Sequence, residues 1–371
     1  MPKVRGVKKL KKEQLEANMQ VTSLAEFISA ISLYPSDRFL FRGENAYYAE
    51  RVSASFRPFD GSWHSKKDHP FIELSKRFYD EVAHRISEFE RAHFIAFSQH
   101  HGIPTNLLDI TSSPLIALYF ACLENEKGDR NQRDQYGYVY IFDDDYVDIT
   151  SILEKYPNEN VLDLLTSDNS EILSIWTKLF EQYRSRHLAS FNACFDLLVD
   201  SLKHYFQLDE DVLLALDDCE DTFGYDQKYL NIISAFNGNH EHIMPINLYD
   251  GNAESFAFMC LLRTFFMKAK NYQEPIHGVT FLPNLYYKPL LVFERGRNQH
   301  SSFMYQAYLS YTEQVYNYYV LMKQRIHHKI CIRIENKDKI LRDLDNIGIN
   351  RKTIFSDFDN IANYICLQYN Q

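Results

Sequence analysis

The sequence predicts an α+β fold in which a small mixed sheet is flanked by helices and carries a large, mainly helical insertion. Apolar residues recur every three or four positions over 71–96, as in an amphipathic helix. Residues 151–275 show the same helical spacing over much of their length. Short apolar runs with the residue types of strands lie on both sides of this segment, at 38–42, 105–110, 138–142 and 329–335.

The composition is that of an ordinary globular protein, with 371 residues of which 45% are hydrophobic and 24% charged. The net charge of −10 argues against a broad nucleic-acid-binding surface but leaves room for a local basic groove. Six cysteines lack a Cys-x-x-Cys spacing, which argues against a zinc site or a disulfide framework and favours reduced thiols. The basic start lacks the apolar core of a signal peptide, and no apolar run is long enough to span a bilayer. We therefore expect a cytoplasmic protein with no metal and no membrane contact.

We divide the chain into a flexible basic arm (1–20), a first part of the core (21–150), a helical insertion (151–275) and a second part of the core (276–371). The insertion has helix-period segments and an acidic run at 209–221. We expect it to lie beside the functional site, as a lid or as a surface for a partner.

The elements of the first part follow from local signals. A helix over 24–33 is capped by Ser23, and the strand at 38–42 ends at Gly43. Residues 44–68 have no clear period and predict a long loop, which in a compact domain is often functional. The helix predicted from residue 71 ends before Gly102.

The most informative stretch runs from Gln99 to Ala121. Thr105–Ile110 predicts a buried strand, and Ser113-Pro114 opens a helix because the hydroxyl caps it and proline fits its first position. Residues 115–123 are apolar nearly all round, so this helix is buried. The free amides of the helix start can hold an anion such as a phosphate. The alternative is a structural corner whose polar groups only cap and hydrogen-bond.

The second part of the core has weaker signals. We predict a strand at 290–293, a sheet or helix segment at 302–311, a strand at 329–335, a helix over 337–346 that Gly348 ends, and a last helix over 357–369. Neither the acidic turn at 143–148 nor the pair His240 and His242 has the spacing of a metal site.

Three segments together resemble the FRG domain family, which is named after its Phe-Arg-Gly signature. The first is Phe41-Arg42-Gly43-Glu44, and the third is a tail that includes Arg295, Gln299 and Phe303. The second is Gln99–Ala121, which resembles the pattern Gln-His-aromatic/His-Gly-x-Pro-Thr-Arg-Leu-Leu-Asp-Trp-Thr. Here Asn106 and Ile110 replace the usual Arg and Trp. The resemblance covers 41–125 and about 283–371.

The chain is also similar, more distantly, to ADP-ribosyltransferases of the arginine–serine–glutamate branch. These enzymes begin with an Arg-Gly strand, here Arg42-Gly43, and continue with Ser-Thr-Ser before a helix, here Thr111-Ser112-Ser113. The resemblance implies their fold, with NAD as substrate and the guanidinium on the pyrophosphate. Where the family has a Glu on a later strand, this chain has Gln299, with Glu294 nearby.

The resemblance implies two groups of site residues. The catalytic group is Arg42, Glu294, Glu44 and Gln299. The NAD-binding group is Arg42, Gly43, His100, His101, Asp109, Thr111, Ser112, Ser113 and Arg295. Gln299 carries no charge to stabilise a cationic ribose, so Glu294 or Glu44 would supply the carboxylate. We expect one pocket to be lined by Arg42, His101, Asp109, Thr111, Ser113 and Gln299.

Three functions compete. The resemblance favours an NAD-using ADP-ribosyltransferase-like enzyme or toxin, acting on an unidentified macromolecular acceptor, for example in bacterial or phage-conflict defence. The second is a nucleotide-binding or sensing module without chemistry. The third is a hydrolase with His100 or His101 as base and Asp109 as orienter, for which the sequence marks no nucleophile.

Each candidate residue also has a purely structural alternative. Arg42 could form a buried ion pair with Asp109 or Glu44, and the two histidines could meet a helix dipole. The hydroxyls of 111–113 could cap, and Arg295 and Gln299 could bridge strands.

Overall fold

The computed structural model describes residues 17–48, 50–57, 71–124, 135–167, 169–208, 210–217, 232, 253–270, 276, 279–290, 294–310, 320–355 and 357–369. Within these ranges, no helix combines the length and the apolar character needed to cross a membrane.

The predicted mixed sheet is confirmed, but it is wider than expected. Its strands are β1 (Met19–Val21), β2 (Leu40–Glu44), β3 (Leu107–Thr111), β4 (Gly137–Phe142), β5 (Tyr146–Asp148), β6 (Asn284–Tyr287), β7 (Ser301–Tyr305) and β10 (Ile330–Ile334). They form one eight-stranded sheet in the order β1-β10-β4-β2-β3-β7-β6-β5. The β1–β10 and β5–β6 pairs are parallel and the other neighbours are antiparallel. β8 (Tyr308–Ser310) and β9 (Val320–Lys323) form a separate pair.

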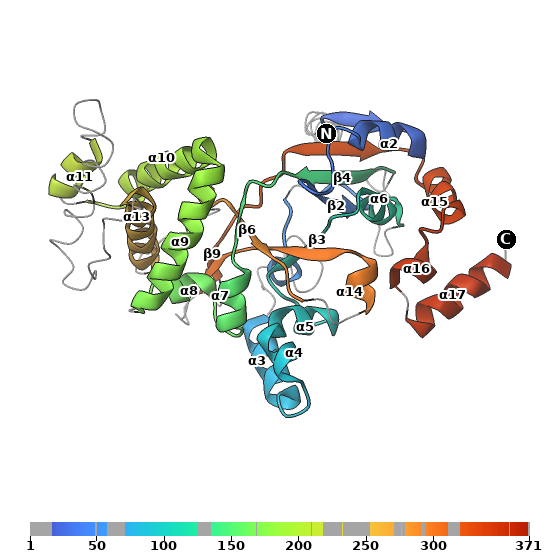
Figure 1. Ribbon diagram of the computed structural model, residues 1–371, viewed down its shortest axis with the longest axis horizontal. Coiled ribbons are helices and arrows are strands. Elements are labelled where there is room, and N and C mark those ends of the chain that lie inside the picture. The colour runs from blue at the N-terminus through green and yellow to red at the C-terminus, as the bar shows by residue number, and fades with distance from the viewer. Residues whose placement is uncertain are drawn as a thin grey trace, which may run out of the picture.

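Helices flank the sheet and extend from one of its ends (Figure 1). The helices of the first part are α2 (Leu24–Ile31), the 3-10 turn η1 (Ala54–Phe56), α3 (Phe71–Val82), α4 (Glu88–Ala92), α5 (Phe94–His100) and α6 (Pro114–Cys122). The middle of the chain contains α7 (Thr150–Lys155), α8 (Val161–Leu165), α9 (Ser170–Arg186), α10 (Leu188–Tyr205), α11 (Glu210–Asp217) and α13 (Ala253–Lys270). The last helices are α14 (Glu294–Asn298), α15 (Lys337–Asn346), α16 (Arg351–Phe355) and α17 (Phe358–Tyr369).

Helices α2, α6 and α15 cover one face of β1, β10, β4 and β2, which we call the α6 face. The approach of α6 is close because two glycines lie beneath it. A Cβ atom on Gly43 would lie 1.8 Å from the Ala117 carbonyl oxygen, and one on Gly137 would lie 2.1 Å from the Ala121 carbonyl oxygen. The glycine of the Phe-Arg-Gly segment therefore serves helix–sheet packing.

The other face of the same strands, which we call the tyrosine face, is lined by large side chains. Tyr138, Tyr140 and Phe142 of β4 pack there with Leu108 and Ile110 of β3. β4 is buried along its whole length, as expected for a strand covered on both faces.

The helices of the middle segment share a core with the sheet. Trp176 and Phe180 of α9 and Phe258 of α13 are in the same cluster of buried residues as Phe303 and Tyr305 of β7.

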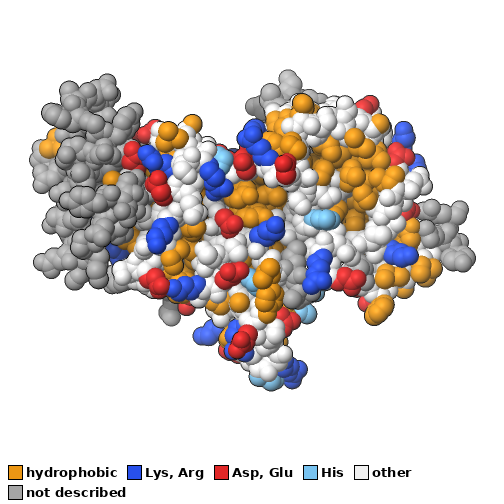
Figure 2. All heavy atoms as spheres, in the orientation of Figure 1, with side chains coloured by type: hydrophobic (Ala, Val, Ile, Leu, Met, Phe, Trp, Pro, Cys, Tyr) orange, Lys and Arg blue, Asp and Glu red, His pale blue; other side chains and the backbone are white. Residues whose placement is uncertain are grey.

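Basic and acidic side chains are interspersed over the face seen in Figure 2.

Several predictions require correction. The single helix predicted over 71–96 is wrong: it is divided into α3, α4 and α5. Ser87 caps α4 in a capping box with Glu90, which starts a new helix. The end of the basic arm is also ordered, because β1 pairs with β10. The pair His240 and His242, and residues 291–293 of the predicted strand, lie outside the described residues.

Candidate functional site

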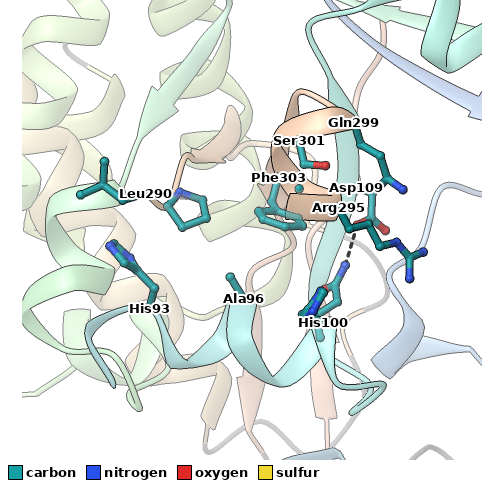
Figure 3. A pocket seen from close by; sticks show the side chains of 12 residues that line it. His93, Ala96, His100, Asp109, Leu290, Arg295, Gln299, Ser301 and Phe303 are labelled. Carbon is teal, nitrogen blue, oxygen red and sulfur yellow. Dashed lines mark hydrogen bonds between the residues drawn. The ribbon is translucent and has the colours of Figure 1, made fainter. Parts of the chain in front are cut away.

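A pocket opens on the side of β3 that belongs to the α6 face, between α5 and α14 (Figure 3). It encloses about 220 Å³. The residues that line it are His93, Ala96, Gln99, His100, Asp109, Pro289, Leu290, Arg295, Gly296, Gln299, Ser301 and Phe303. The polar groups of Asp109, His100, Arg295 and Gln299 lie at one end, and Leu290 and His93 lie at the other. The pocket therefore has a polar end and a largely apolar end.

Asp109 is the central residue of β3 and the one exposed residue of that strand. Its side chain lines the pocket together with Gln99 and His100 of α5. Gln99 Nε2 donates to Asp109 Oδ1 at 2.8 Å, and the Thr105 hydroxyl donates to Gln99 Oε1. The carboxylate is thus fixed by a neutral donor, and within the described residues no cationic side chain forms an ion pair with it.

Arg295 and His100 supply positive charge and proton-transfer capacity to the polar end. The Arg295 guanidinium lies 4.9 Å from the centre of the Phe355 ring. Its charge also reaches the Asp357 carboxylate, whose pKa is lowered first by hydrogen bonds from Asn360 and further by Arg295. Desolvation lowers the pKa of His100, and His101 and Arg295 lower that pKa further. A neutral imidazole at neutral pH follows.

The hydroxyls of the Thr-Ser-Ser segment have structural partners. Thr111 Oγ1 donates to the Gln299 carbonyl oxygen at 2.7 Å and accepts from the Ser113 amide at 3.0 Å. Ser113 Oγ accepts from the Ile116 amide at 3.4 Å and caps α6. The capping alternative thus describes Thr111 and Ser113, and neither they nor Ser112 line the pocket.

Arg42 and Glu44 do not join the pocket, so the prediction that Arg42 and Thr111 share one pocket is wrong. Phe41 lies directly opposite Thr111, so Asp109 and Thr111 project from the α6 face with Phe41. Arg42, one residue along, projects from the tyrosine face opposite Tyr140. There Arg42 Nε forms an ion pair with Glu44 Oε1 at 2.8 Å. The structural alternative of an Arg42–Glu44 pair is therefore present.

Of the remaining predicted residues, His100, Asp109, Arg295 and Gln299 line the pocket, whereas Glu294, His101 and Gly43 do not. Glu294 begins α14, is exposed and lies outside the pocket lining, and neither it nor Gln299 is on a strand. His101 caps the C-terminus of α5, and its ring centre lies 4.4 Å from that of Phe97. Gly43 lies beneath α6.

Sequence reasoning missed the residues that complete the pocket. His93 counted as an apolar position of the predicted helix, yet its buried ring lines the pocket with Nδ1 3.1 Å from the Tyr287 hydroxyl. Its Nε2 lies 3.8 Å from Glu154 Oε1 of α7. A histidine on an apolar helix face was the available signal. Gln99 lay inside the central motif, whereas Ser301 carried no local signal.

Residues 37–130 match the FRG domain family. The chain contains an FRG domain. No curated protein and no solved structure matched the chain.

The FRG domain contributes one wall of the pocket. Gln99, His100 and Asp109 lie inside the matched range, whereas Arg295 and Gln299 come from the chain beyond it. The two departures from the family pattern are buried: Asn106 Nδ2 donates to the Gln306 carbonyl oxygen at 3.0 Å, and Ile110 packs on the tyrosine face. Both replacements are accommodated in the core of the chain.

Proposed function

We propose that the pocket binds NAD by its nicotinamide half and cleaves the bond between nicotinamide and ribose, for transfer of ADP-ribose to a macromolecular acceptor. The observation that carries the proposal is the Asp109 carboxylate, held in the centre of the sheet by a neutral donor and facing the same pocket as the cationic Arg295. This assigns to Asp109 the role of the carboxylate that stabilises the cationic ribose, which the resemblance to ADP-ribosyltransferases gave to Glu294 or Glu44.

The pocket suits part of this ligand. A volume of about 220 Å³ is below the roughly 300–1,000 Å³ of pockets that enclose a complete drug-sized ligand. The apolar end, with Leu290, Ala96 and Phe303, suits a flat aromatic ring. Asp109 would then face the ribose and Arg295 the phosphate attached to it. The adenosine half would lie outside.

The proposed step is balanced by these groups. The glycosidic C–N bond breaks and its electron pair leaves with the nicotinamide nitrogen, which becomes neutral. Positive charge develops on the ribose, and a carboxylate at that position stabilises it. A hydroxyl of the acceptor forms the new bond at the ribose carbon and gives its proton to the neutral His100 imidazole.

Arg295→Gln is expected to weaken NAD binding by about 10- to 100-fold, since a hydrogen bond to a charged group contributes roughly 1.5–3 kcal/mol. Calorimetric titration with NAD measures this. The matched control is Arg297→Gln on the same short helix, outside the pocket lining, which should bind NAD like the wild type. Equal affinities of all three proteins would remove the pocket from NAD recognition.

The rate of nicotinamide release is expected to fall in acid. The pKa of His100 lies below the usual 6.5, so the base is neutral above that pKa and is lost as the pH falls through it. Rates measured between about pH 5 and 8 should show this decrease toward acid pH in the wild type and in the exposed control His204→Gln. His100→Gln should be slower and should lack the decrease. A decrease that persists in His100→Gln would assign the titration to another group.

A nucleotide-binding module without chemistry is the second candidate. The observation that favours it is that the Arg42–Glu44 pair and the Thr111 and Ser113 hydroxyls are engaged within the protein. This module would bind NAD and release no nicotinamide. In either case the described cysteines, all free thiols, fit a cytoplasmic location.

A further inference from the structure

We infer that Arg42 positions the Asp109 carboxylate from the opposite side of the sheet instead of contacting a ligand. The inference rests on the proposed function for its kinetic readout, and on the strand geometry for its structural one. It replaces the pyrophosphate-binding role that the family resemblance implied for Arg42.

The two strands that carry these residues diverge. Phe41 opposite Thr111 is the only register pair between β2 and β3, although β3 pairs with β7 along its whole length. Beyond this pair, the residues of β2 up to Glu44 have no register partner on β3, and the residues of β3 back to Leu107 have none on β2. Asp109 lies in this unpaired part of β3, which leaves a gap between the two strands.

The carbonyl of Asp109 faces this gap. The Ser112 amide donates to the His300 carbonyl, and the Asn106 carbonyl accepts from the Gln306 amide. The amide and carbonyl groups of successive residues point to opposite neighbours of an antiparallel strand. In this segment those of even-numbered residues therefore point to β7 and those of odd-numbered residues point to β2. Without a strand partner, the Asp109 carbonyl needs a donor from elsewhere.

Arg42 supplies that donor. Its Nη1 donates to the Asp109 carbonyl oxygen at 2.8 Å, and its Nε is fixed by Glu44 Oε1 at 2.8 Å. The two side chains are only 13% and 5% exposed. A guanidinium carries its donors in a rigid fork, so Arg42 can bind the Glu44 carboxylate and also reach the neighbouring strand β3. Glu44 thus aims Arg42, and Arg42 holds the main chain of Asp109.

The position of the carboxylate follows from these contacts. β7 holds the residues of β3 on both sides of Asp109, Arg42 holds the Asp109 carbonyl at the other edge of the strand, and Gln99 fixes the carboxylate itself. Loss of the Arg42 contact frees β3 to shift toward or away from β2. A displacement of about 1 Å in a reacting group costs on the order of 10²-fold in rate.

The test uses the double variant Arg42→Gln/Glu44→Gln, because Arg42→Gln alone would leave a buried carboxylate unpaired and could unfold the protein. With a cooperative melt as the folding check, nicotinamide release should lose about 10- to 100-fold in kcat while KM for NAD stays within about threefold. The control Glu73→Gln/Arg77→Gln removes an exposed ion pair on α3 and should retain wild-type kcat. A rise in KM at unchanged kcat would instead place Arg42 on the ligand.

A second readout does not depend on turnover. In protein labelled with ¹³C at the aspartate carbonyls, the Asp109 signal should shift in the double variant and not in the control Glu73→Gln/Arg77→Gln, with or without NAD. An unchanged signal in the double variant overturns the inference even if the wild type cleaves NAD. A shifted signal with no cleavage by the wild type preserves the positioning role and refutes the proposed function alone.

Discussion

Replacing Gly43 with alanine is expected to destabilise the protein by about 3 kcal/mol or more. The new Cβ would lie 1.8 Å from the Ala117 carbonyl oxygen and 2.7 Å from the Ala121 amide nitrogen. Both are backbone atoms inside α6, which cannot turn aside as a flexible side chain can. The whole helix must move off β2 and β4, and domains of this kind are stable by only about 5–15 kcal/mol.

Urea denaturation of Gly43→Ala and of the control Gly102→Ala measures this. Gly102 has φ +85°, and a Cβ atom added there would meet no atom within 4 Å, so its replacement costs only the left-handed backbone conformation, about 1–2 kcal/mol. The midpoint should fall much further for Gly43→Ala. Equal midpoints would show that α6 accommodates the methyl group, contrary to the packing argument.

Replacing Asp109 with asparagine is expected to slow nicotinamide release by about 10²–10³-fold, the usual effect of removing one electrostatic group from a reacting centre. Asparagine keeps the size and an oxygen that can accept from Gln99, so the change removes charge and little else. The charge acts on the cationic transition state, so NAD affinity should change by no more than about threefold.

Steady-state nicotinamide release and calorimetric titration separate these two effects. Asp200→Asn, an exposed change on α10, is the matched control and should behave as the wild type in both. If Asp109→Asn instead lowers NAD affinity and kcat/KM by the same factor while kcat stays unchanged, the carboxylate acts in binding and not in bond cleavage.

The elements with local signals were predictable from the sequence. The strand at 138–142 corresponds to β4, and the helix opened by Ser113 and Pro114 corresponds to α6, because a cap and an apolar run are properties of adjacent residues. The division of the predicted helix over 71–96 was also readable, since Ser87 and Glu90 have the capping-box spacing. The apolar period continues through this position and masks the capping signal that ends one helix and begins the next.

The assembly of the site was less predictable, because it depends on register. Arg42 and Asp109 are both polar residues in short apolar strands, and nothing local says which faces they share. The pairing of Phe41 with Thr111 places them on opposite faces, and a shift of one residue would have reversed this. Gln299 and Arg295 reach the pocket through the turn and short helix before β7, far from the central motif.

The most direct test of the account is nicotinamide release by the wild-type protein. The purified protein is incubated with NAD labelled in the nicotinamide ring, with protein and nucleic-acid acceptors present, and free nicotinamide is quantified by chromatography. We predict that labelled nicotinamide accumulates with the wild type and that Asp109→Asn abolishes most of it. Intact NAD after incubation with wild-type protein, at concentrations where calorimetry shows the pocket to be filled, would contradict the proposed chemistry.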